Sequence, residues 1–137
     1  MASKVTAKVT GKRPSGQNTH ELRLKRIYEP AAKSDGFRVL VDRLWPRGIA
    51  KDKAHIDLWL KDVAPSDALR HMMHDDPSKW DDFVAAYGRE LKQEPAKSAF
   101  AELHEAIKKR PVTLLYAARD EAHNNAVALK RHLEKIK

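Results

Sequence analysis

The chain has 137 residues, of which 42% are hydrophobic, and this length is enough for one compact core but short for two. Lys and Arg number 27 against 19 Asp and Glu, giving a formal net charge of +8 that favours anionic partners in general terms. The absence of cysteine excludes disulfides, thiolate nucleophiles and zinc sites with Cys ligands. With neither a secretory-signal pattern nor an apolar run near the roughly 20 residues of a membrane span, we expect a cytoplasmic protein without a membrane partner.

The first twenty residues differ in composition from the rest of the chain. They contain Lys4, Lys8, Lys12 and Arg13 and no acidic residue, so four of the eight excess positive charges lie there. Because the segment has few large apolar side chains, it cannot offset the entropy cost of ordering. We therefore predict a disordered basic tail over residues 1–20 and a single α/β domain over residues 21–137. An arm that touches phosphate backbones is the alternative interpretation of the tail.

Three segments are predicted to be strands. LRLKRIY over residues 22–28 alternates apolar side chains, as a half-buried strand does, and the Asp35-Gly36 turn signal follows it. FRVLV over residues 37–41 and VTLLYAA over residues 112–118 are continuously apolar, which suits strands covered on both faces. Strands joined by a long helical crossover are almost always parallel, so we expect the second and third strands to be parallel neighbours.

After the Trp45 to Gly48 break, the whole chain to residue 110 has a pattern that predicts helices. Ser66 is expected to cap a short helix, and Asp76 with Pro77 predicts the start of a second one. The buried stripe of this second helix is predicted to consist of Trp80, Phe83, Val84, Tyr87 and Leu91.

Two further helices are predicted. Pro95 opens one that ends before Pro111, with Phe100, Leu103 and Ile107 pointing inward. The closing segment from residue 119 is predicted to be helical from about Asp120, with Ala122, Ala126, Leu129, Leu133 and Ile136 on its buried side. The sequence thus predicts an α/β fold: a small, mostly parallel sheet of three or four strands covered by four or five helices, in a two-layer or Rossmann-like three-layer arrangement.

Polar side chains follow both apolar strands. VDRLWPRG over residues 41–48 ends one strand, and YAARDEAHNN over residues 116–125 ends the other. Because the carboxyl ends of parallel strands meet at one edge, where open α/β sheets bind ligands, we expect a polar cleft there.

The residue types at this edge suit an anionic ligand. Arg43, Arg47 and Arg119 are typical of clamps for phosphate or carboxylate, and the predicted helix start at Asp120 adds a partial positive charge. Proton transfer would fall to Asp42 with His74 or His123, while Trp45 or Tyr116 would stack on a ring.

The same residues have structural explanations. Asp120 is also a candidate N-cap, Asp42 with Arg43 or Arg119 suits an ion pair across strand ends, and Trp45 suits a packed turn. These alternatives stay open at the level of sequence.

Metal and cofactor motifs are weak or missing. His71 and His74 share a helix face beside Asp75 and Asp76, but no third ligand is identifiable, and we predict no metal site. The motifs GxSxG, GxxxxGK[ST], HExxH and GxGxxG do not occur, so no motif names a cofactor.

The segments KRIYEPAAKSDGFRVLVDRLWPRGIAK, PSDALRHMMH and LLYAARDEAHNNAVAL, with Trp59 between the first two, resemble the YeaO-like family of uncharacterised bacterial proteins, domain of unknown function family 488. The resemblance covers about residues 22–136 and implies a small cytoplasmic α/β domain without an established activity. The longer branch of the wider family tends to end its last strand in a Cys-His-Arg stretch. This chain has no cysteine, so a thiol mechanism is not available to it.

The resemblance also extends the candidate site. The family's recurring positions fall on Tyr28, Asp35, Gly36, Arg38, Asp42, Arg43, Trp45, Pro46, Arg47, Gly48, Trp59, Pro65, Ser66, Leu69, Arg70, His74, Tyr116, Ala117, Arg119, Asp120, His123, Asn124 and Ala126. The catalytic candidates are Asp42, His74 and His123. The ligand-binding candidates are Tyr28, Arg43, Trp45, Arg47, Arg70, Tyr116, Arg119, Asp120 and Asn124.

Three functions are compatible with these residues. The favoured one is an enzyme or binding domain for a small anionic molecule, such as a nucleotide or another phosphorylated metabolite. The second is a nucleic-acid-associated protein, in which the tail and the Lys108 to Arg110 cluster contact phosphates. The third is a structural domain whose polar cluster is a buried network. No motif identifies a substrate, a reaction or an oligomeric state.

Overall fold

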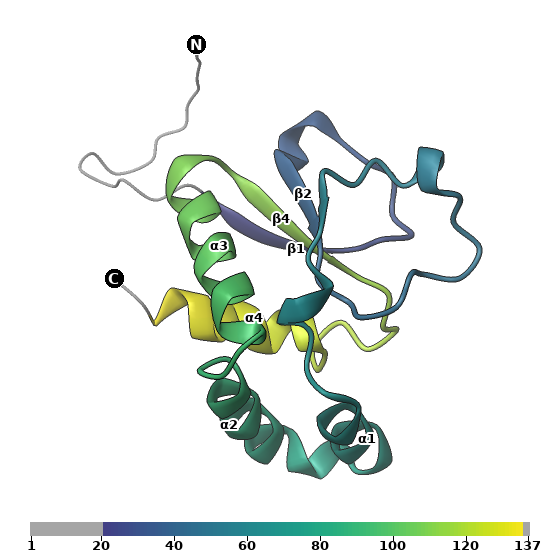
Figure 1. Cartoon of the computed structure of the whole chain (residues 1–137). Coiled ribbons are helices and arrows are strands. Elements are labelled where there is room, and N and C mark those ends of the chain that lie inside the picture. The colour runs from purple at the N-terminus through teal and green to yellow at the C-terminus, as the bar shows by residue number, and fades with distance from the viewer. Residues whose placement is uncertain (1–20, 136–137) are drawn as a thin grey trace.

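The computed structural model describes residues 21–135, apart from the side chains of His74, Asp75 and Pro77. Four strands form one sheet in the order β1-β4-β2-β3, and every pairing in it is parallel. The strands are β1 (Leu22–Arg26), β2 (Phe37–Leu40), β3 (Leu58–Trp59) and β4 (Val112–Tyr116). The helices are α1 (Asp67–Asp75), α2 (Trp80–Glu90), α3 (Ala96–Lys109) and α4 (Asn125–Glu134). The predicted α/β class and the parallel pairing of β2 with β4 are therefore confirmed (Figure 1).

The two faces of the sheet are covered differently. Successive side chains of a strand point to opposite faces, so Val39 and Leu114 join the large core with the helices, whereas Leu40 and Leu115 join a separate cluster. Ile27, Trp45, Ile49, Ile56 and Trp59 complete this second cluster with Ala117. The connections between the strands thus cover the face that the helices leave open, and of the two predicted arrangements the structure has the two-layer one (Figure 1).

The helices follow the predicted pattern closely. Ser66 caps α1 by accepting a hydrogen bond from Leu69 N, and the predicted stripe of α2 is buried throughout. In α3, Leu103 is fully buried, while Phe100 and Ile107 are half-buried against the same core. No helix within residues 21–135 is long and apolar enough to cross a membrane.

Two predicted elements are wrong. Residues 49–66 are not helical, because Leu58 and Trp59 pair with Val39 and Leu40 as β3, leaving room only for the short 3-10 turns Lys51–Lys53 and Lys61–Val63. These pairings are extended by the backbone of β2: the Arg38 carbonyl accepts from Asp57 N, and the Leu40 carbonyl accepts from Leu60 N.

The last helix begins at Asn125 instead of near Asp120. Asn124 is its N-cap and accepts from Val127 N, whereas the Asp120 carboxylate accepts from Ala122 N and His123 N in the turn before the helix. Ala122 is consequently exposed, against the prediction. The predicted tail over residues 1–20 and Ile136 lie outside the described residues.

Gly36 is required where the chain enters β2. Its φ is +66°, and a Cβ added there would lie 2.5 Å from the carbonyl oxygen of Pro111. The same carbonyl accepts from Phe37 N, so it cannot move away without loss of the first bond between β2 and the chain before β4.

We predict that Gly36→Ala lowers the free energy of unfolding by about 3 kcal/mol or more, because backbone strain and steric overlap add. The matched variant is Gly48→Ala, where φ is +77° but nothing lies within 4 Å of the added Cβ. Gly48→Ala should lower the free energy of unfolding by only about 1 kcal/mol. Urea denaturation of both variants measures the difference, and equal losses would contradict the close approach at Gly36.

Candidate functional site

The Asp42 side chain closes the carboxyl edge of the sheet. It follows β2, and its Oδ2 accepts a hydrogen bond of 2.9 Å from Ala117 N, directly after β4. Its Oδ1 accepts a bond of 3.0 Å from the amide of Asn125 in the first turn of α4. That amide also donates to the Val41 carbonyl, so one carboxylate and one amide fix β2, β4 and α4 relative to each other.

The environment of Asp42 makes its charged form costly. Burial raises the pKa of this carboxyl, and the bonds from Asn125 and Ala117 and the charge of Arg70 offset this only in part. Both oxygens receive hydrogen bonds from donors that hold the fold together. Asp42 is thus held as a structural acceptor, and no hydrogen bond joins it to a described histidine.

Arg43 and Arg70 lie on the α1 side of this network. Arg43 Nη2 donates to the carbonyls of Ala64 and Pro65, at 2.9 and 3.4 Å, and so anchors the chain before α1. Arg70 is exposed and forms an ion pair of 2.8 Å with Asp67 within the same helix. The contacts of each arginine involve its Nη2 alone, so their ligand-binding roles stay predictions from the sequence.

The other end of the edge is built around Tyr28. Its hydroxyl donates to the Arg47 carbonyl at 3.0 Å, and the Arg26 guanidinium lies 5.0 Å from the centre of its ring. Arg26 also donates to the carbonyls of Ala117 and Ala118, so the Arg47 and Arg119 segments are both connected to Tyr28. Within residues 21–135, the exposed guanidinium groups of Arg47 and Arg119 form no hydrogen bond or ion pair.

The aromatic candidates have packing roles. Trp45 meets Trp59 edge to face, with ring centres 5.4 Å apart, and its indole N–H donates to the Ile49 carbonyl. Tyr116 is buried, and burial raises the pKa of its hydroxyl, with Asn124 opposing the shift. Neither ring is free to act as an exposed stacking platform.

Asp120, His123 and Asn124 form the turn that leads into α4. Hydrogen bonds from Ala122 N and His123 N lower the pKa of Asp120. The His123 ring lies 3.2 Å from Asp120 Oδ2 and meets Trp80 edge to face at 5.1 Å. Asn124 is buried, and its amide donates to the Asp120 carbonyl.

The remaining catalytic candidate, His74, belongs to α1, and its side chain lies outside the described ones. Among the described side chains, no group of three or more His, Asp or Glu residues is placed to hold a metal ion. The predicted edge therefore contains a packed polar network with Tyr28, Arg47 and Arg119 exposed at one end.

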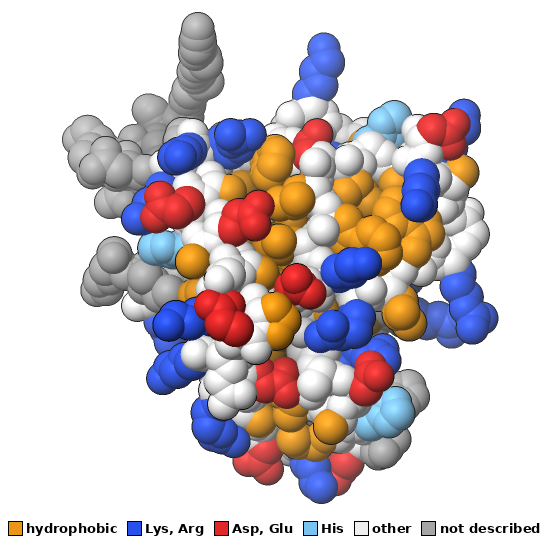
Figure 2. Space-filling model, in the orientation of Figure 1, with side chains coloured by type: hydrophobic (Ala, Val, Ile, Leu, Met, Phe, Trp, Pro, Cys, Tyr) orange, Lys and Arg blue, Asp and Glu red, His pale blue; other side chains and the backbone are white. Residues whose placement is uncertain are grey.

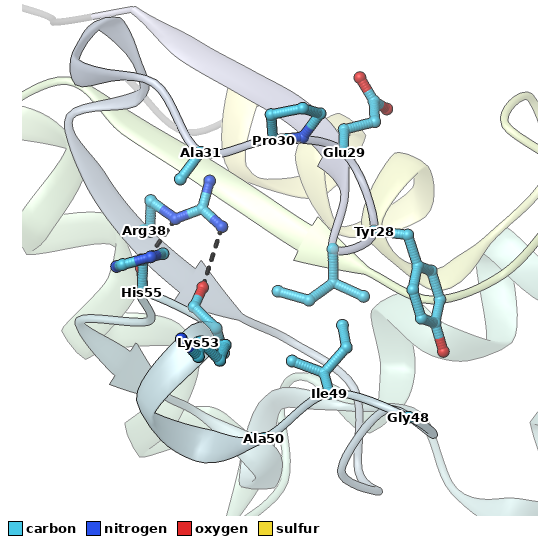
Figure 3. A pocket seen from close by; sticks show the side chains of 12 residues that line it. Tyr28, Glu29, Pro30, Ala31, Arg38, Gly48, Ile49, Ala50, Lys53 and His55 are labelled. Carbon is cyan, nitrogen blue, oxygen red and sulfur yellow. Dashed lines mark hydrogen bonds between the residues drawn. The ribbon is translucent and has the colours of Figure 1, made fainter.

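A pocket that the sequence did not predict lies on the face that the connections cover. It has a volume of about 490 Å³. It is formed by the chain after β1 and by the segment between β2 and β3, and it shares only Tyr28 with the predicted site (Figure 3). The lining residues are Ile27, Tyr28, Glu29, Pro30, Ala31, Arg38, Gly48, Ile49, Ala50, Lys53, Ala54 and His55.

The surface around this region is mixed in character. Figure 2 shows hydrophobic side chains gathered on the upper right of the molecule, where Figure 1 places the segment between β2 and α1. Lys and Arg side chains surround them (Figure 2). Tyr28 and Leu44 are the large hydrophobic residues that are most exposed within residues 21–135, at 44% and 65%.

Arg38 forms the closed end of the pocket. Only 5% of the residue is exposed, and its guanidinium bonds the carbonyls of Ala54 and His55 and the Asp35 carboxylate. A guanidinium has five N–H groups, and these contacts use three of them, so two are left for a ligand.

Two cations share one buried carboxylate beside the pocket. Asp35 forms ion pairs with two cations, at 2.5 Å with Arg38 and 3.0 Å with Lys25. Burial alone would raise the pKa of Asp35, but bonds from Ala32 N, Lys25 and Arg38 outweigh it and the pKa lies below its ordinary value. The Asp35 carboxylate is thus shared by two positive groups, of which Arg38 lines the pocket, and a second carboxylate, that of Asp57, accepts from Arg38 N.

The pocket has a polar and an apolar end. Figure 3 shows Arg38, Lys53 and His55 together at one end, Ile49 near the middle, and Tyr28 at the opposite end. Sequence reasoning missed this pocket because its residues come from two connections without a motif. The available signals were Asp35 and Arg38, a charged pair flanking an apolar strand, and the Asp35-Gly36 turn was interpreted only as a break.

We predict that Asp42→Ala lowers the free energy of unfolding by about 2 kcal/mol or more, because the Ala117 N–H is left buried without an acceptor and Asn125 loses one of its two. Arg47→Ala is the matched surface variant. Its guanidinium has no partner in the described structure, so its unfolding free energy should stay within about 0.5 kcal/mol of the parent. Urea denaturation compares them, and a large loss in Arg47→Ala would show that this arginine is part of a closed network.

We predict a pH-dependent loss for Asp35→Asn. At pH 7 the variant should lose about 3 to 5 kcal/mol, because two cations are left without their carboxylate. Since the pKa of Asp35 is lowered by folding, its contribution is complete above the ordinary Asp pKa near 4 and is lost as the pH falls through the lower folded value. The difference between parent and variant should therefore shrink as the pH falls below about 4. Urea denaturation at several pH values tests this, and the exposed Asp52→Asn should show no such trend.

Comparisons with known proteins agree on one family. The family model DUF488-N3i, described as the inactive DUF488-N3 subclade, matches residues 21–136. The uncharacterized protein YeaO of Escherichia coli is 40% identical over 115 residues, which are 84% of this chain and 98% of that protein. The uncharacterized protein Rv3073c of Mycobacterium tuberculosis is 41% identical over 112 residues, 82% of this chain and 92% of that protein.

No solved structure matches the chain with significant similarity. The family match and these relatives cover most of the chain, and they support the family that the DRLWPRG and YAARDEAHNN segments indicate. The chain therefore belongs to the YeaO-like DUF488 family of uncharacterised proteins.

Proposed function

We propose that this chain is a non-catalytic binding domain for a small anionic molecule, held in the pocket lined by Arg38 and Tyr28. The observation that carries the proposal is the position of the buried Arg38 guanidinium in the pocket lining, where it shares the Asp35 carboxylate with the partly buried Lys25. A ligand anion would accept from the remaining N–H groups of Arg38 and would add a second counter-ion for the two cations that share Asp35. Lys53 and His55, exposed at the same end, add further donors.

The shape of the pocket indicates the rest of the ligand. A volume of about 490 Å³ lies within the range of small-molecule sites, roughly 300 to 1,000 Å³. An anionic group would bind at the Arg38 end, and an apolar or aromatic body would lie along Ile49 toward the Tyr28 ring. Nucleotides and other phosphorylated ring compounds combine these two features.

Two observations favour binding without catalysis. Both oxygens of Asp42 are occupied by bonds that hold the fold, and neither Asp42 nor His123 lines the pocket. The matching subclade is described as inactive, which is consistent with a domain that binds and releases its ligand unchanged. The catalytic roles of Asp42, His74 and His123 stay predictions from the sequence.

Phenyl phosphate is the smallest probe with both features, and two-dimensional NMR of the labelled protein follows its binding. We predict that amide signals of residues 27–31 and 48–55 shift, and that inorganic phosphate and phenol each bind more weakly than phenyl phosphate. Lys53→Ala should weaken binding about tenfold, the effect of one lost charge-assisted hydrogen bond.

Lys51→Ala is the matched control. Lys51 belongs to the same 3-10 turn and carries the same charge, but it lies over the Trp45 ring and does not line the pocket. The affinity of Lys51→Ala for phenyl phosphate should equal that of the parent protein. Shifts confined to residues 117–125 would place the ligand at the strand edge instead. If Lys53→Ala and Lys51→Ala weaken binding equally, the ligand is attracted by the general positive charge of the surface and not by the pocket.

A further inference from the structure

We propose that the groove between α2, α3 and α4 binds an acidic amphipathic helix of a partner protein. This groove lies on the helical side of the sheet, and it shares no residue with the pocket around Arg38. The two proposals are therefore independent.

The floor of the groove is apolar and lies close to the helix backbones. Ala85, Gly88 and Leu91 of the α2 side face Phe100 and Ala101 of α3 across a volume of about 780 Å³. Gly88 is needed here, because a Cβ at this position would lie 2.6 Å from the His132 ring of α4. The His132 ring packs into the space that Gly88 provides, and the small side chains of Ala85 and Ala101 leave a recess between the helices, the shape that receives the apolar face of a further helix.

The rim of the groove carries positive charge only. Its charged and titratable lining residues are Arg89, Lys92, Lys97, His104, His132 and Lys135, and within residues 21–135 no acidic residue lines it. The four Lys and Arg side chains of this rim form no ion pair within the described part of the chain.

Other lysines on the same helices are paired. Lys108 of α3 bonds Glu105, and Lys130 of α4 bonds Glu134. Within the described residues these lysines thus have acidic partners outside the groove, whereas the rim cations form no ion pair, although the charge of Lys97 acts on the nearby Glu94. This charge pattern is complementary to an acidic partner.

Three other occupants fit the groove less well. The segment over residues 1–20 contains Lys4, Lys8, Lys12 and Arg13 and no acid, so it has the same sign of charge as the rim. Two copies that met groove to groove would oppose like charges, as a twofold interface requires the same patch on both sides. An anionic membrane would need a protruding apolar face, whereas this apolar surface is recessed.

The test uses fluorescence anisotropy of the full chain with a labelled 18-residue probe peptide, which has Leu at helical i, i+3, i+4 and i+7 spacing and Glu at the other positions. Saturable binding is expected. A peptide with Lys in place of every Glu, and one with Ser in place of every Leu, should each bind at least tenfold more weakly. If the Ser peptide binds as well as the probe, binding is by charge alone and the groove proposal fails.

Charge-reversal variants locate the probe. Lys97→Glu lies in the first turn of α3, where an acidic residue is favourable for the helix, so the fold is retained. It should weaken binding at least tenfold, and Ala101→Glu on the exposed floor should do the same. Lys33→Glu makes the same change of net charge away from the groove and should leave the affinity unchanged. Equal losses in Lys97→Glu and Lys33→Glu would overturn the proposal.

Two further measurements decide between occupants. Sedimentation of the free chain should show no self-association that Ala101→Glu abolishes. Flotation with phosphatidylserine vesicles should show no binding that depends on Lys97. Either positive result, together with a failure of the probe peptide to bind, would assign the groove to a second copy or to a lipid surface and overturn the peptide proposal.

Discussion

The hydrogen bond from Ala117 N to the Asp42 carboxylate is the contact on which the arrangement of the sheet depends. Val41 N still bonds the Leu115 carbonyl, and beyond it the two central strands part. The Asp42 side chain then takes the place of the next backbone acceptor. Because its other oxygen bonds Asn125 and its carbonyl accepts from the Trp59 indole, the same residue also positions α4 and β3. Asp42, which directly follows an apolar strand, therefore has a structural role.

Much of this fold is predictable from local patterns. The continuous apolar runs of β2 and β4 predict buried parallel neighbours, and the spacing from Trp80 to Leu91 predicts the buried face of α2. The two-residue strand β3 has no pattern of its own, since it is defined by its pairing with Val39 and Leu40. The start of α4 was mispredicted because Asp120, Asn124 and Asn125 are all common capping residues, and tertiary bonds select Asn124.

The candidate site is likewise predictable from the sequence only in part. Parallel strand ends must meet at one edge, so the neighbourhood of Asp42, Tyr116 and the turn at Asp120 follows from topology. The sequence does not tell whether such a cluster is open to a ligand or closed by hydrogen bonds within the protein. This depends on the lengths and directions of the hydrogen bonds that the side chains of Asn125 and Arg43 donate. The pocket at Arg38 forms only where two irregular connections approach each other, and its apolar residues resemble any others in the chain.

The positively charged side chains of this molecule differ in whether they have partners within the fold. At the strand edge most cations are used internally, as Arg43 is on carbonyls and Arg70 on Asp67. Among the described residues, Arg47 and Arg119 at this edge form no ion pair, and at the loop-side pocket and the helical groove the lining cations lack acidic partners or outnumber them. The sheet separates these two surfaces, and β4, buried along its whole length, lies between them.

The connection from β2 to β3 crosses over the sheet without an α-helix, held by Trp45 packed on Trp59 and by the bond from Trp45 to Ile49. A helical crossover would tie each wall residue to the periodicity of a helix, whereas this segment is held at its tryptophans and by the bonds from Arg38 to the carbonyls of Ala54 and His55. Substitutions between Ile49 and Lys53, outside these anchors, can therefore reshape the pocket without altering strand register. Within one unchanged scaffold, related chains are free to diverge in what they bind by varying this short stretch alone.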